Sequence, residues 1–308
     1  MSIADITTGT AESLRTDSPA GRAESLRTDS PAEAAWDAAP AETVRSLVRS
    51  FGSAVVAFSG GVDSSVVLAL AVEQLGADRV LAVTSRSETY LEEEFTEAAE
   101  VAARLGVSHH VIETKELGIP GFSSNPPDRC YHCKAELFGE LAGIAAERGF
   151  ETVVDGANLD DMGDFRPGIK AADELGVRHP LMEAGLGKDA VRALARSMGL
   201  SNWAKPAMAC LSSRFPYGEA ITREKLSMVA RAEALLRAAG YAQLRVRHHG
   251  VTARIELPAD EVAAFACDVP LRSRVVAEFK DIGYRYVTLD LEGFRSGSMN
   301  EALEGERR

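Results

Sequence analysis

Cysteine is scarce in this chain, with four residues among 308, and basic residues are fewer than acidic ones. Four thiols are too few for a disulfide framework in a chain of this length, so they are better interpreted as metal ligands, reactive groups or core residues. The chain has 34 lysines and arginines against 46 acidic residues, a net charge of −12. This balance argues against a broad nucleic-acid-binding surface.

Long apolar runs are also missing from the sequence. No stretch approaches the roughly 18 apolar residues of a membrane span, and the polar N-terminus lacks the basic and then apolar order of a secretion signal. We therefore expect a cytoplasmic protein with no membrane partner. With 45% hydrophobic residues the chain can bury a sizeable core, and its length suggests two domains.

The N-terminal region contains a perfect repeat. The segment Ala-Glu-Ser-Leu-Arg-Thr-Asp-Ser-Pro-Ala occurs at residues 11–20 and again at 23–32, in a background rich in serine, alanine, proline and aspartate. This composition buries too little apolar surface to offset the entropy of ordering. We predict a disordered tail over residues 1–40, with the folded region beginning near Ala41.

The next part of the sequence alternates between strand and helix patterns. Helices are expected at 42–50, up to Leu75, at 88–105 and at 134–148, and strands at 54–58, 80–84, 109–112 and 152–155. Such alternation predicts an α/β fold with a doubly wound parallel sheet, which binds its ligand beyond the carboxyl ends of the strands. We assign this domain to residues 41–215.

After Pro216-Tyr217-Gly218 the order of elements changes. Helices at 223–239, 260–267 and 271–282 are expected together with strands near 244–246, 252–257 and 286–289. This pattern predicts a smaller C-terminal α+β domain over residues 216–308.

A glycine-rich loop follows the first strand of the α/β region. Two adjacent glycines let backbone N–H groups close around an anion, serine hydroxyls add donors, and the following helix, expected to begin near Ser65, points its positive end at the loop. No Gly-Lys-Ser/Thr ending is present, so cleavage between the α and β phosphates of ATP is favoured over kinase-like chemistry. A bound Mg²⁺ ion would remove the charge repulsion between the carboxylate of Asp63 and a polyphosphate. The predicted loop residues are Ser59, Gly60, Gly61, Val62, Asp63, Ser64 and Ser65.

Other polar positions fall at the same predicted sheet edge. Ser85 and Gly156 each follow a strand, so we expect them to contribute to the nucleotide site. Asp160 and Asp161 come shortly after Gly156 and could either hold Mg²⁺ or cap the next helix.

Three cysteines lie in segments suited to chemistry. Cys130 and Cys133 form a Cys-x-x-Cys spacing before a predicted helix, where the helix dipole and basic neighbours favour thiolates. Cys210 lies in a polar, proline-marked segment expected to be a surface loop. Zinc would need a fourth ligand, for which His132 or Cys267 could serve, whereas a [4Fe-4S] cluster on three thiolates leaves one iron open. Cys267 itself is expected to be a buried, inert thiol.

The sequence Ser-Gly-Gly-Val-Asp-Ser-Ser resembles the PP-loop of the adenine nucleotide α-hydrolase-like superfamily, whose members adenylate a substrate and release pyrophosphate. Together with the segments 129–134 and 205–218, it is similar to the LarE sulfur transferases, over about residues 55–289. The resemblance implies ATP-dependent sulfur transfer to pyridinium-3,5-biscarboxylic acid mononucleotide in nickel-pincer nucleotide synthesis, and a homo-oligomer. Cys210 matches the sulfur-bearing cysteine of that family.

This chain departs from family members that use a single cysteine as the sacrificed sulfur source. Its extra Cys130 and Cys133 resemble the variant in which three cysteines hold a [4Fe-4S] cluster, with sulfide or another sulfur donor loading the open iron. ATP first transfers AMP to a carboxylate, because oxide is a poor leaving group, and sulfur then displaces AMP. Cys210 and Asp63 are the expected catalytic residues, with ATP, Mg²⁺ and the cluster as cofactors.

The nucleotide substrate carries two carboxylates and a phosphate, which guanidinium groups hold well. We expect Arg214, Arg245 and Arg247 to bind it. Arg245 and Arg247 alternate on one face of a predicted strand, and Glu256 on the next strand could orient them. Surface arginines in loose ion pairs are the alternative interpretation.

Two other functions remain open on the sequence. Some PP-loop tRNA thiolases also combine a Cys-x-x-Cys pair with a further cysteine, but residues 216–308 show no basic stripe interleaved with aromatics. The other alternative is a noncatalytic ATP-sensing module in which the cysteines hold structural zinc.

Overall fold

The computed structural model describes residues 38–90, 92–163, 166–206, 209–295 and 297–298, which belong to one compact unit. The duplicated N-terminal segment lies outside the described residues. The first helix, α1, spans Ala38–Arg49 and so begins slightly before the predicted start of the folded region.

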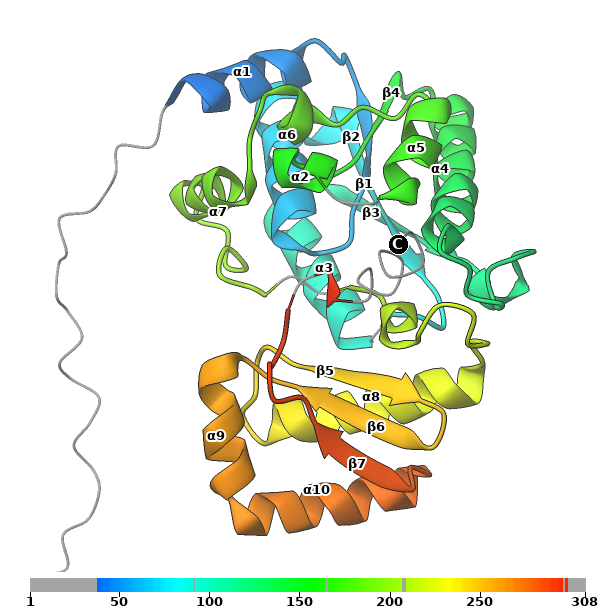
Figure 1. The fold of residues 1–308 in the computed structure, drawn as a ribbon. Helices are drawn as coiled ribbons and strands as arrows, with labels where there is room; N and C mark the ends of the chain where they lie inside the picture. Colours follow the sequence, from blue (N-terminus) through cyan, green and yellow to red (C-terminus); the bar gives the residue numbers. More distant parts are fainter. Residues whose placement is uncertain (1–37, 91, 164–165, 207–208, 296, 299–308) are drawn as a thin grey trace, which may run out of the picture. The chain divides into compact units, whose positions relative to one another are not determined.

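The first part of the chain builds a parallel sheet from strands β1 (Ala54–Ala57), β2 (Val80–Arg86), β3 (Ser108–Glu113) and β4 (Thr152–Val154). Its strand order is β3-β2-β1-β4, so the chain moves outward from β1 to β3 and then returns to the other side of β1. All three strand pairs are parallel. The predicted doubly wound α/β class is therefore confirmed (Figure 1).

Three helices alternate with the strands as predicted: α2 (Val62–Leu75), α3 (Glu92–Arg104) and α4 (Arg129–Arg148). Three further helices after β4 were not predicted: α5 (Pro167–Glu174), α6 (Pro180–Glu183) and α7 (Lys188–Ser197). Side chains of α4, among them Phe138 and Leu141, pack with the buried strand residues Val55 and Val83 on one face of the sheet. Helix α2 contacts the sheet and is covered in turn by α1 and α7. The central strands β1 and β2 are therefore buried on both faces, which explains their apolar runs, whereas β3 at the edge of the sheet is mostly exposed or half-buried.

Two of the helix starts that differ from the prediction matter for the site. α2 begins at Val62, three residues before the predicted start, so Asp63 and Ser64 lie in its first turn. α4 begins at Arg129 because the N–H of Arg129 closes a turn onto the carbonyl of Pro126, at 3.0 Å, and the helix follows directly. The Cys-x-x-Cys pair therefore lies inside the helix rather than in a loop before it.

A second, smaller sheet follows in the C-terminal part, as predicted. Its strands are β5 (Arg245–His249), β6 (Thr252–Glu256) and β7 (Tyr286–Leu289), with β5 antiparallel and β7 parallel to β6. Helices α8 (Arg223–Ala238), α9 (Ala259–Cys267) and α10 (Val269–Ile282) belong to the same region, and a buried apolar cluster joins them to the strands. The domain boundary at residues 215 and 216 stays a prediction.

Within the described ranges, no helix has the length and apolar character that a membrane crossing requires.

Candidate active site

The polar loops after β1 and β4 meet because these strands are neighbours. Val56 pairs with Val154, and the strand order reverses between β1 and β4, because β2 and β3 lie on one side of β1 and β4 lies on the other. In doubly wound folds the crevice at such a reversal is where ligands bind. The predicted loop from Ser59 to Ser65 and the predicted Gly156 therefore lie at one site.

The loop after β1 is held by its own serines. Ser59 and Ser64 place their hydroxyl oxygens 3.2 Å apart, and the N–H of Ser59 donates to the Ser64 hydroxyl at 3.3 Å. The N–H of Gly61 lies 3.3 Å from the Ser59 hydroxyl. Ser65 is fully buried, so its side chain contributes to the support of the loop rather than to its surface.

Two glycines are required here by close contact. Gly60 has a φ of +74°, and a Cβ at this position would lie 2.9 Å from the Cβ of Ala98. A Cβ on Gly156 would lie 2.7 Å from the backbone nitrogen of Ser64, in the first turn of α2. The β4 loop can therefore approach the phosphate loop only where a side chain is missing.

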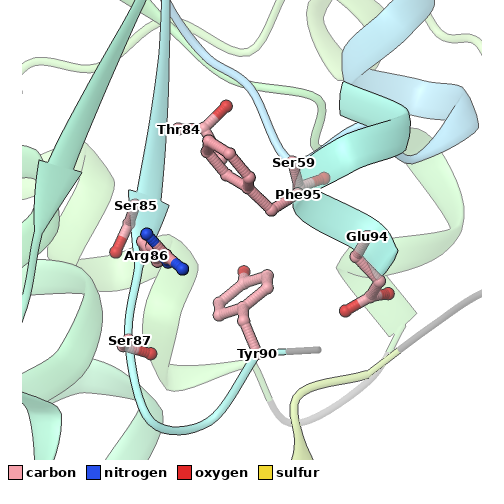
Figure 2. A pocket seen from close by; sticks show the side chains of 8 residues that line it. All are labelled: Ser59, Thr84, Ser85, Arg86, Ser87, Tyr90, Glu94 and Phe95. Carbon is pink, nitrogen blue, oxygen red and sulfur yellow. The ribbon is translucent and has the colours of Figure 1, made fainter. Parts of the chain in front are cut away.

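A pocket opens beside this loop (Figure 2), with about 350 Å³ of empty space. Its lining residues come from the end of β1, from the end of β2 with the loop that follows, and from α3: Ser59, Thr84, Ser85, Arg86, Ser87, Tyr90, Glu94 and Phe95. The predicted Ser85 lines this pocket, and its hydroxyl lies 2.6 Å from that of Thr114. The guanidinium of Arg86 lies over the ring of Phe95, 5.5 Å from its centroid. Hydroxyls and a cation beside an aromatic ring suit a nucleotide.

Asp63 occupies an unusual position in the first turn of α2. Its Oδ1 is buried and has no hydrogen-bond partner among the described residues. Burial raises the pKa of its carboxyl, the nearby Lys188 opposes this effect, and Asp161 adds to it. A buried acceptor beside a second carboxylate and a lysine suits a site that holds Mg²⁺ with a polyphosphate.

The two aspartates for which the sequence left two roles open both cap backbone groups. Asp160 accepts from the N–H of Lys188 at 2.7 Å, at the start of α7. Asp161 accepts from the N–H of Asn158 at 3.1 Å, and its negative charge also helps to raise the pKa of Asp63.

The three predicted site cysteines have different surroundings. Cys130 is exposed and Cys133 half-buried, both in the first turns of α4, while Cys210 is half-buried and precedes a short 3₁₀ helix, Leu211–Arg214. The expectation of a surface loop fits the exposed Ala209 but is wrong for the residues after Cys210, because Leu211 is buried and its N–H donates to the carbonyl of Thr89, 3.0 Å away.

The three thiols nevertheless lie close enough for the charge of one to shift the pKa of another. Burial raises the pKa of Cys210; Arg129 opposes this effect, and Cys130 adds to it. Burial and the carboxylate of Glu116 raise the pKa of Cys133, whose Sγ lies 3.0 Å from Glu116 Oε1. Burial raises the pKa of Tyr90, which lines the pocket, and the charges of Cys210 and Glu116 add to this effect. The sulfur-bearing residues therefore adjoin the candidate ATP site.

No group of three or more His, Cys, Asp or Glu residues within the described ranges is arranged to hold a metal ion. Thiolates around one zinc ion would lie about 3.8 Å apart, given Zn–S bonds of about 2.3 Å and tetrahedral geometry. A four-iron cluster places several atoms between its thiolates and spaces them more widely. The three site cysteines are free thiols whose charges affect one another, and the group that they would hold stays a prediction.

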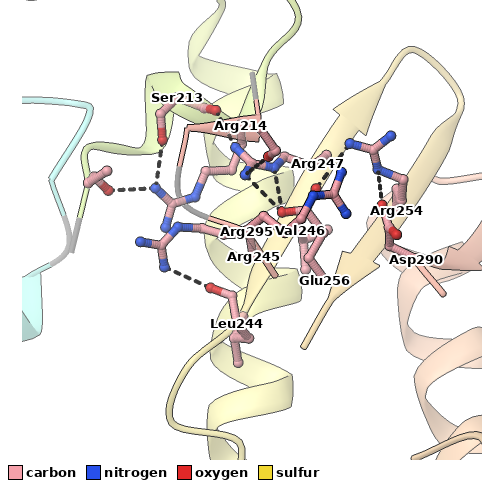
Figure 3. Close-up of polar contacts among 12 residues, drawn as sticks. Ser213, Arg214, Leu244, Arg245, Val246, Arg247, Arg254, Glu256, Asp290 and Arg295 are labelled. Atoms are coloured by element: carbon pink, nitrogen blue, oxygen red, sulfur yellow. Dashed lines mark hydrogen bonds and ion pairs between the residues drawn. The ribbon is translucent and has the colours of Figure 1, made fainter. Parts of the chain in front are cut away.

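The predicted arginines lie in a buried network (Figure 3). Arg247 donates from Nε to Glu256 Oε2 at 2.9 Å, as expected from their neighbouring strands, and from Nη1 to the carbonyl of Ser213 at 2.8 Å. Arg214 is fully buried against Glu233. These side chains are therefore not surface arginines in loose ion pairs. Their role in substrate binding stays a prediction.

Arg245 lies in the same network. Burial and the neighbouring charge of Arg214 lower its pKa to about 10. Its guanidinium lies over the ring of Phe294, 5.1 Å from the centroid, and it donates to the carbonyl of Leu244 at 2.8 Å. Clustered guanidinium groups of this kind suit an anionic ligand.

Some residues were misplaced or missed by the sequence interpretation. Cys267 is exposed on α9, so the expectation of a buried thiol is wrong. Glu116, Lys188 and Asn202 were not singled out, because each lies far along the chain from the motif that it contacts. Only the tertiary fold brings them to the site.

Comparison with known proteins matches residues 40–121 to the NAD synthase family. The chain is 42% identical over 261 residues to the pyridinium-3,5-bisthiocarboxylic acid mononucleotide synthase of Lactiplantibacillus plantarum, covering 85% of this chain and 94% of that protein. The chain belongs to the LarE family of PP-loop sulfur transferases. It is also 46% identical over 262 residues to an uncharacterized protein of Synechocystis, covering 85% of this chain and 97% of that one.

Relatives outside the LarE family share only part of the chain. An NH(3)-dependent NAD(+) synthetase of Methanopyrus kandleri is 47% identical over 64 residues, 21% of this chain. Shared identity in this short portion agrees with the common use of ATP, whereas the resemblance to the LarE-type synthase also covers the segments that carry the thiols and the arginines. As a LarE family member the protein is an ATP-using, sulfur-transferring enzyme.

Proposed function

We propose that this protein adenylates the carboxylates of pyridinium-3,5-biscarboxylic acid mononucleotide and converts them to thiocarboxylates, with sulfur carried on a [4Fe-4S] cluster. The carrying observation is that Tyr90 lines the pocket beside the PP-loop, while the carbonyl of the preceding residue, Thr89, accepts the N–H of Leu211, the residue after Cys210, at 3.0 Å. The hydroxyl of Thr89 also donates to Glu116, whose other oxygen lies 3.0 Å from the Cys133 sulfur. An activated acid formed at the PP-loop would then have its sulfur source next to it. Such proximity removes the entropic cost of bringing two reactants together.

The PP-loop residues provide the first half of the reaction. Backbone N–H groups at Gly60 and Gly61, together with the N-terminal end of α2, would hold the phosphates of ATP. Asp63 would bind Mg²⁺ through its unpartnered oxygen, and Lys188 would balance negative charge beside it. Attack by the substrate carboxylate on the α-phosphorus forms the acyl adenylate and releases pyrophosphate.

The second half requires sulfur to displace AMP. Cys130, Cys133 and Cys210 would hold the cluster, which when bound supplies a sulfide for transfer at its open iron. Arg129 lies 3.8 Å from the Cys130 sulfur, and its charge also reaches Cys210, so it would stabilise these sulfurs as thiolates. The pKa values of Cys133 and Cys210 are raised without a metal, and iron binding would therefore release protons from them.

The arginine network would bind the acidic substrate. Arg245 and Arg247 would hold its carboxylates or phosphate, and Glu256 would orient Arg247. Arg214 donates to the carbonyl of Cys210 at 3.0 Å, so it would also fix the backbone that carries this thiol. Sulfide or another small sulfur donor is the proposed co-substrate, and the relationship to LarE supports a homo-oligomer.

The test is mass spectrometry of the biscarboxylated mononucleotide after anaerobic incubation with ATP, Mg²⁺, sulfide and the reconstituted protein. We expect one and then two oxygen-to-sulfur exchanges, with iron and labile sulfide in the purified protein. Cys210→Ala should abolish the exchange but leave pyrophosphate release intact, and Asp63→Ala should suppress both. Stoichiometric zinc without iron, or unchanged thiolation by Cys210→Ala, would contradict the proposal.

A further inference from the structure

We infer that Asn202 is a positioning residue for the PP-loop, which fixes the direction of the peptide between Gly60 and Gly61. This inference rests on the use of ATP in the proposed function. The side-chain amide of Asn202 donates from Nδ2 to the carbonyl of Gly60 at 2.9 Å and to the hydroxyl of Ser65 at 2.8 Å. A carbonyl oxygen can only accept, so the amide must face Gly60 with its N–H groups.

The direction of this one peptide matters for anion binding. In a trans peptide the C=O and the following N–H point to opposite sides. Holding the carbonyl of Gly60 against Asn202 therefore turns the N–H of Gly61 toward the interior of the loop, where it lies 3.3 Å from the Ser59 hydroxyl. If the peptide turned over, an oxygen would face the phosphates in place of a donor, and the anion site would be lost.

Within the loop itself, the contact on this peptide is the 3.3 Å bond from the N–H of Gly61 to the Ser59 hydroxyl. Gly60 has a φ of +74° and Gly61 has no Cβ, so their backbone dihedrals have unusual freedom. Asn202 joins this flexible peptide to Ser65, which is fully buried in the first turn of α2. The contact therefore ties the carbonyl of the peptide to the helix.

Asn202 is itself held firmly, because the segment 201–206 is anchored on two helices. Arg192 of α7 donates to the carbonyls of Trp203 at 3.3 Å and Lys205 at 3.0 Å. Arg104 of α3 donates to the hydroxyl of Ser201 at 2.7 Å, and Lys205 pairs with Glu97 of the same helix. A rigid support of this kind lets one amide group fix a glycine peptide.

The test compares Asn202→Ala with the wild-type protein in the pyrophosphate-release assay and in calorimetric titration with MgATP. Two lost hydrogen bonds should raise both the KM and the Kd for ATP about tenfold. The kcat should change less than about twofold, because the phosphates are held alike before and during the reaction. Hydrogen exchange in residues 58–66 should also become faster in the nucleotide-free variant.

Ala204→Ser is the matched control, because it changes an exposed residue of the same segment and removes none of the side-chain contacts that hold Asn202, and it should behave as wild type. If Asn202→Ala does not fold, Asn202→Asp keeps the shape but removes the donor, and Ala204→Asp controls for its charge. A purely structural Asn202 would lower kcat through a smaller active fraction with KM unchanged, and that result overturns the inference. Failure of the wild-type protein to bind ATP would instead overturn the proposed function as well.

Discussion

Arg214 and Glu233 form an ion pair in which neither side chain is exposed, with Nε 2.8 Å from Oε1 and Nη2 2.9 Å from Oε2. The same guanidinium donates to the carbonyls of Ala209 and Cys210. Glu233 belongs to α8, so this pair connects the helix that packs on the smaller sheet with the segment that carries the proposed sulfur ligand. Breaking it should affect both stability and the placement of Cys210.

We predict that Glu233→Gln lowers the free energy of unfolding by about 3 kcal/mol at neutral pH, because it leaves Arg214 buried without a counter-charge. Burial acts to raise the pKa of Glu233, but the charge and hydrogen bonds of Arg214 outweigh it, and the net pKa is lowered. A lowered pKa gives stability that is present above the unfolded value and is lost as the pH falls through the folded value. The difference in the free energy of unfolding between variant and wild type should therefore become smaller below about pH 4.

Urea unfolding at neutral and acidic pH measures both effects. Glu292→Gln is the control, since Glu292 is 75% exposed in its pair with Arg295, and it should change stability by less than about 0.5 kcal/mol. Equal losses from the two substitutions would contradict the prediction.

A second pH-dependent contact joins β4 to α5. The buried His179 places Nδ1 2.7 Å from Asp155 Oδ1 and Nε2 3.3 Å from Asp173 Oδ1. Burial acts to lower the pKa of His179, yet the two carboxylates raise it overall, Asp155 more strongly. Its contribution to stability is therefore complete below the unfolded pKa of about 6.5 and is lost as the pH rises through the higher folded pKa.

We predict that the wild-type protein loses more stability than His179→Gln as the pH is raised from about 6 to 9, a range that starts below the unfolded pKa of histidine. Urea unfolding of both proteins at intervals across this range provides the comparison. Parallel stability curves would show that the imidazole is neutral in the folded protein and would refute the assignment.

The sequence predicted the parallel sheet and the phosphate loop because their signals are local. Apolar strands followed by Ser59-Gly60-Gly61 and an apolar helix can be recognised within about twenty residues. The helix start at Arg129 was missed because two prolines come shortly before it, although Asp128 at the N-cap position is a residue type typical of that place. As a result, Cys130 and Cys133 were placed in a loop when they lie on a helix.

The surroundings of the site were harder to predict, since they depend on contacts distant in sequence. Asn202 reaches Gly60 across 142 positions, and nothing near either residue indicates the pairing. The pairing of Arg247 with Glu256 was predicted, because strand alternation places them on neighbouring strands. The deep burial of Arg214 was not, since its local sequence is polar and carries a proline.

The cluster of buried arginines around Arg245 leads to a prediction about substrate affinity. Arg245→Lys keeps a charge but loses the planar fork that suits carboxylate or phosphate. We expect it to weaken binding of the biscarboxylated mononucleotide about tenfold in calorimetric titration, with ATP affinity unchanged. Arg285→Lys, at an exposed position after α10, is the control and should bind normally. Unaltered binding by Arg245→Lys would assign this guanidinium to folding alone.

The close approach of Gly156 to the first turn of α2 gives the most direct test of the nucleotide site. A Cβ at position 156 would lie 2.7 Å from the nitrogen of Ser64 and 3.0 Å from the carbonyl carbon of Asp63, and neither is the movable end of a side chain. Gly156→Ala must therefore push the β4 loop away from α2. We expect at least about a tenfold loss of ATP affinity and a destabilisation of about 1–3 kcal/mol.

Gly143→Ala provides the matched control for this substitution. Gly143 is exposed within α4, and a Cβ there meets no atom within 4 Å. Replacing a helical glycine with alanine should raise stability by up to about 1 kcal/mol and leave ATP binding unchanged. Calorimetric titration with MgATP and thermal unfolding of both variants separate the outcomes. If Gly156→Ala binds ATP as well as Gly143→Ala, the β4 loop does not limit the geometry of the phosphate site.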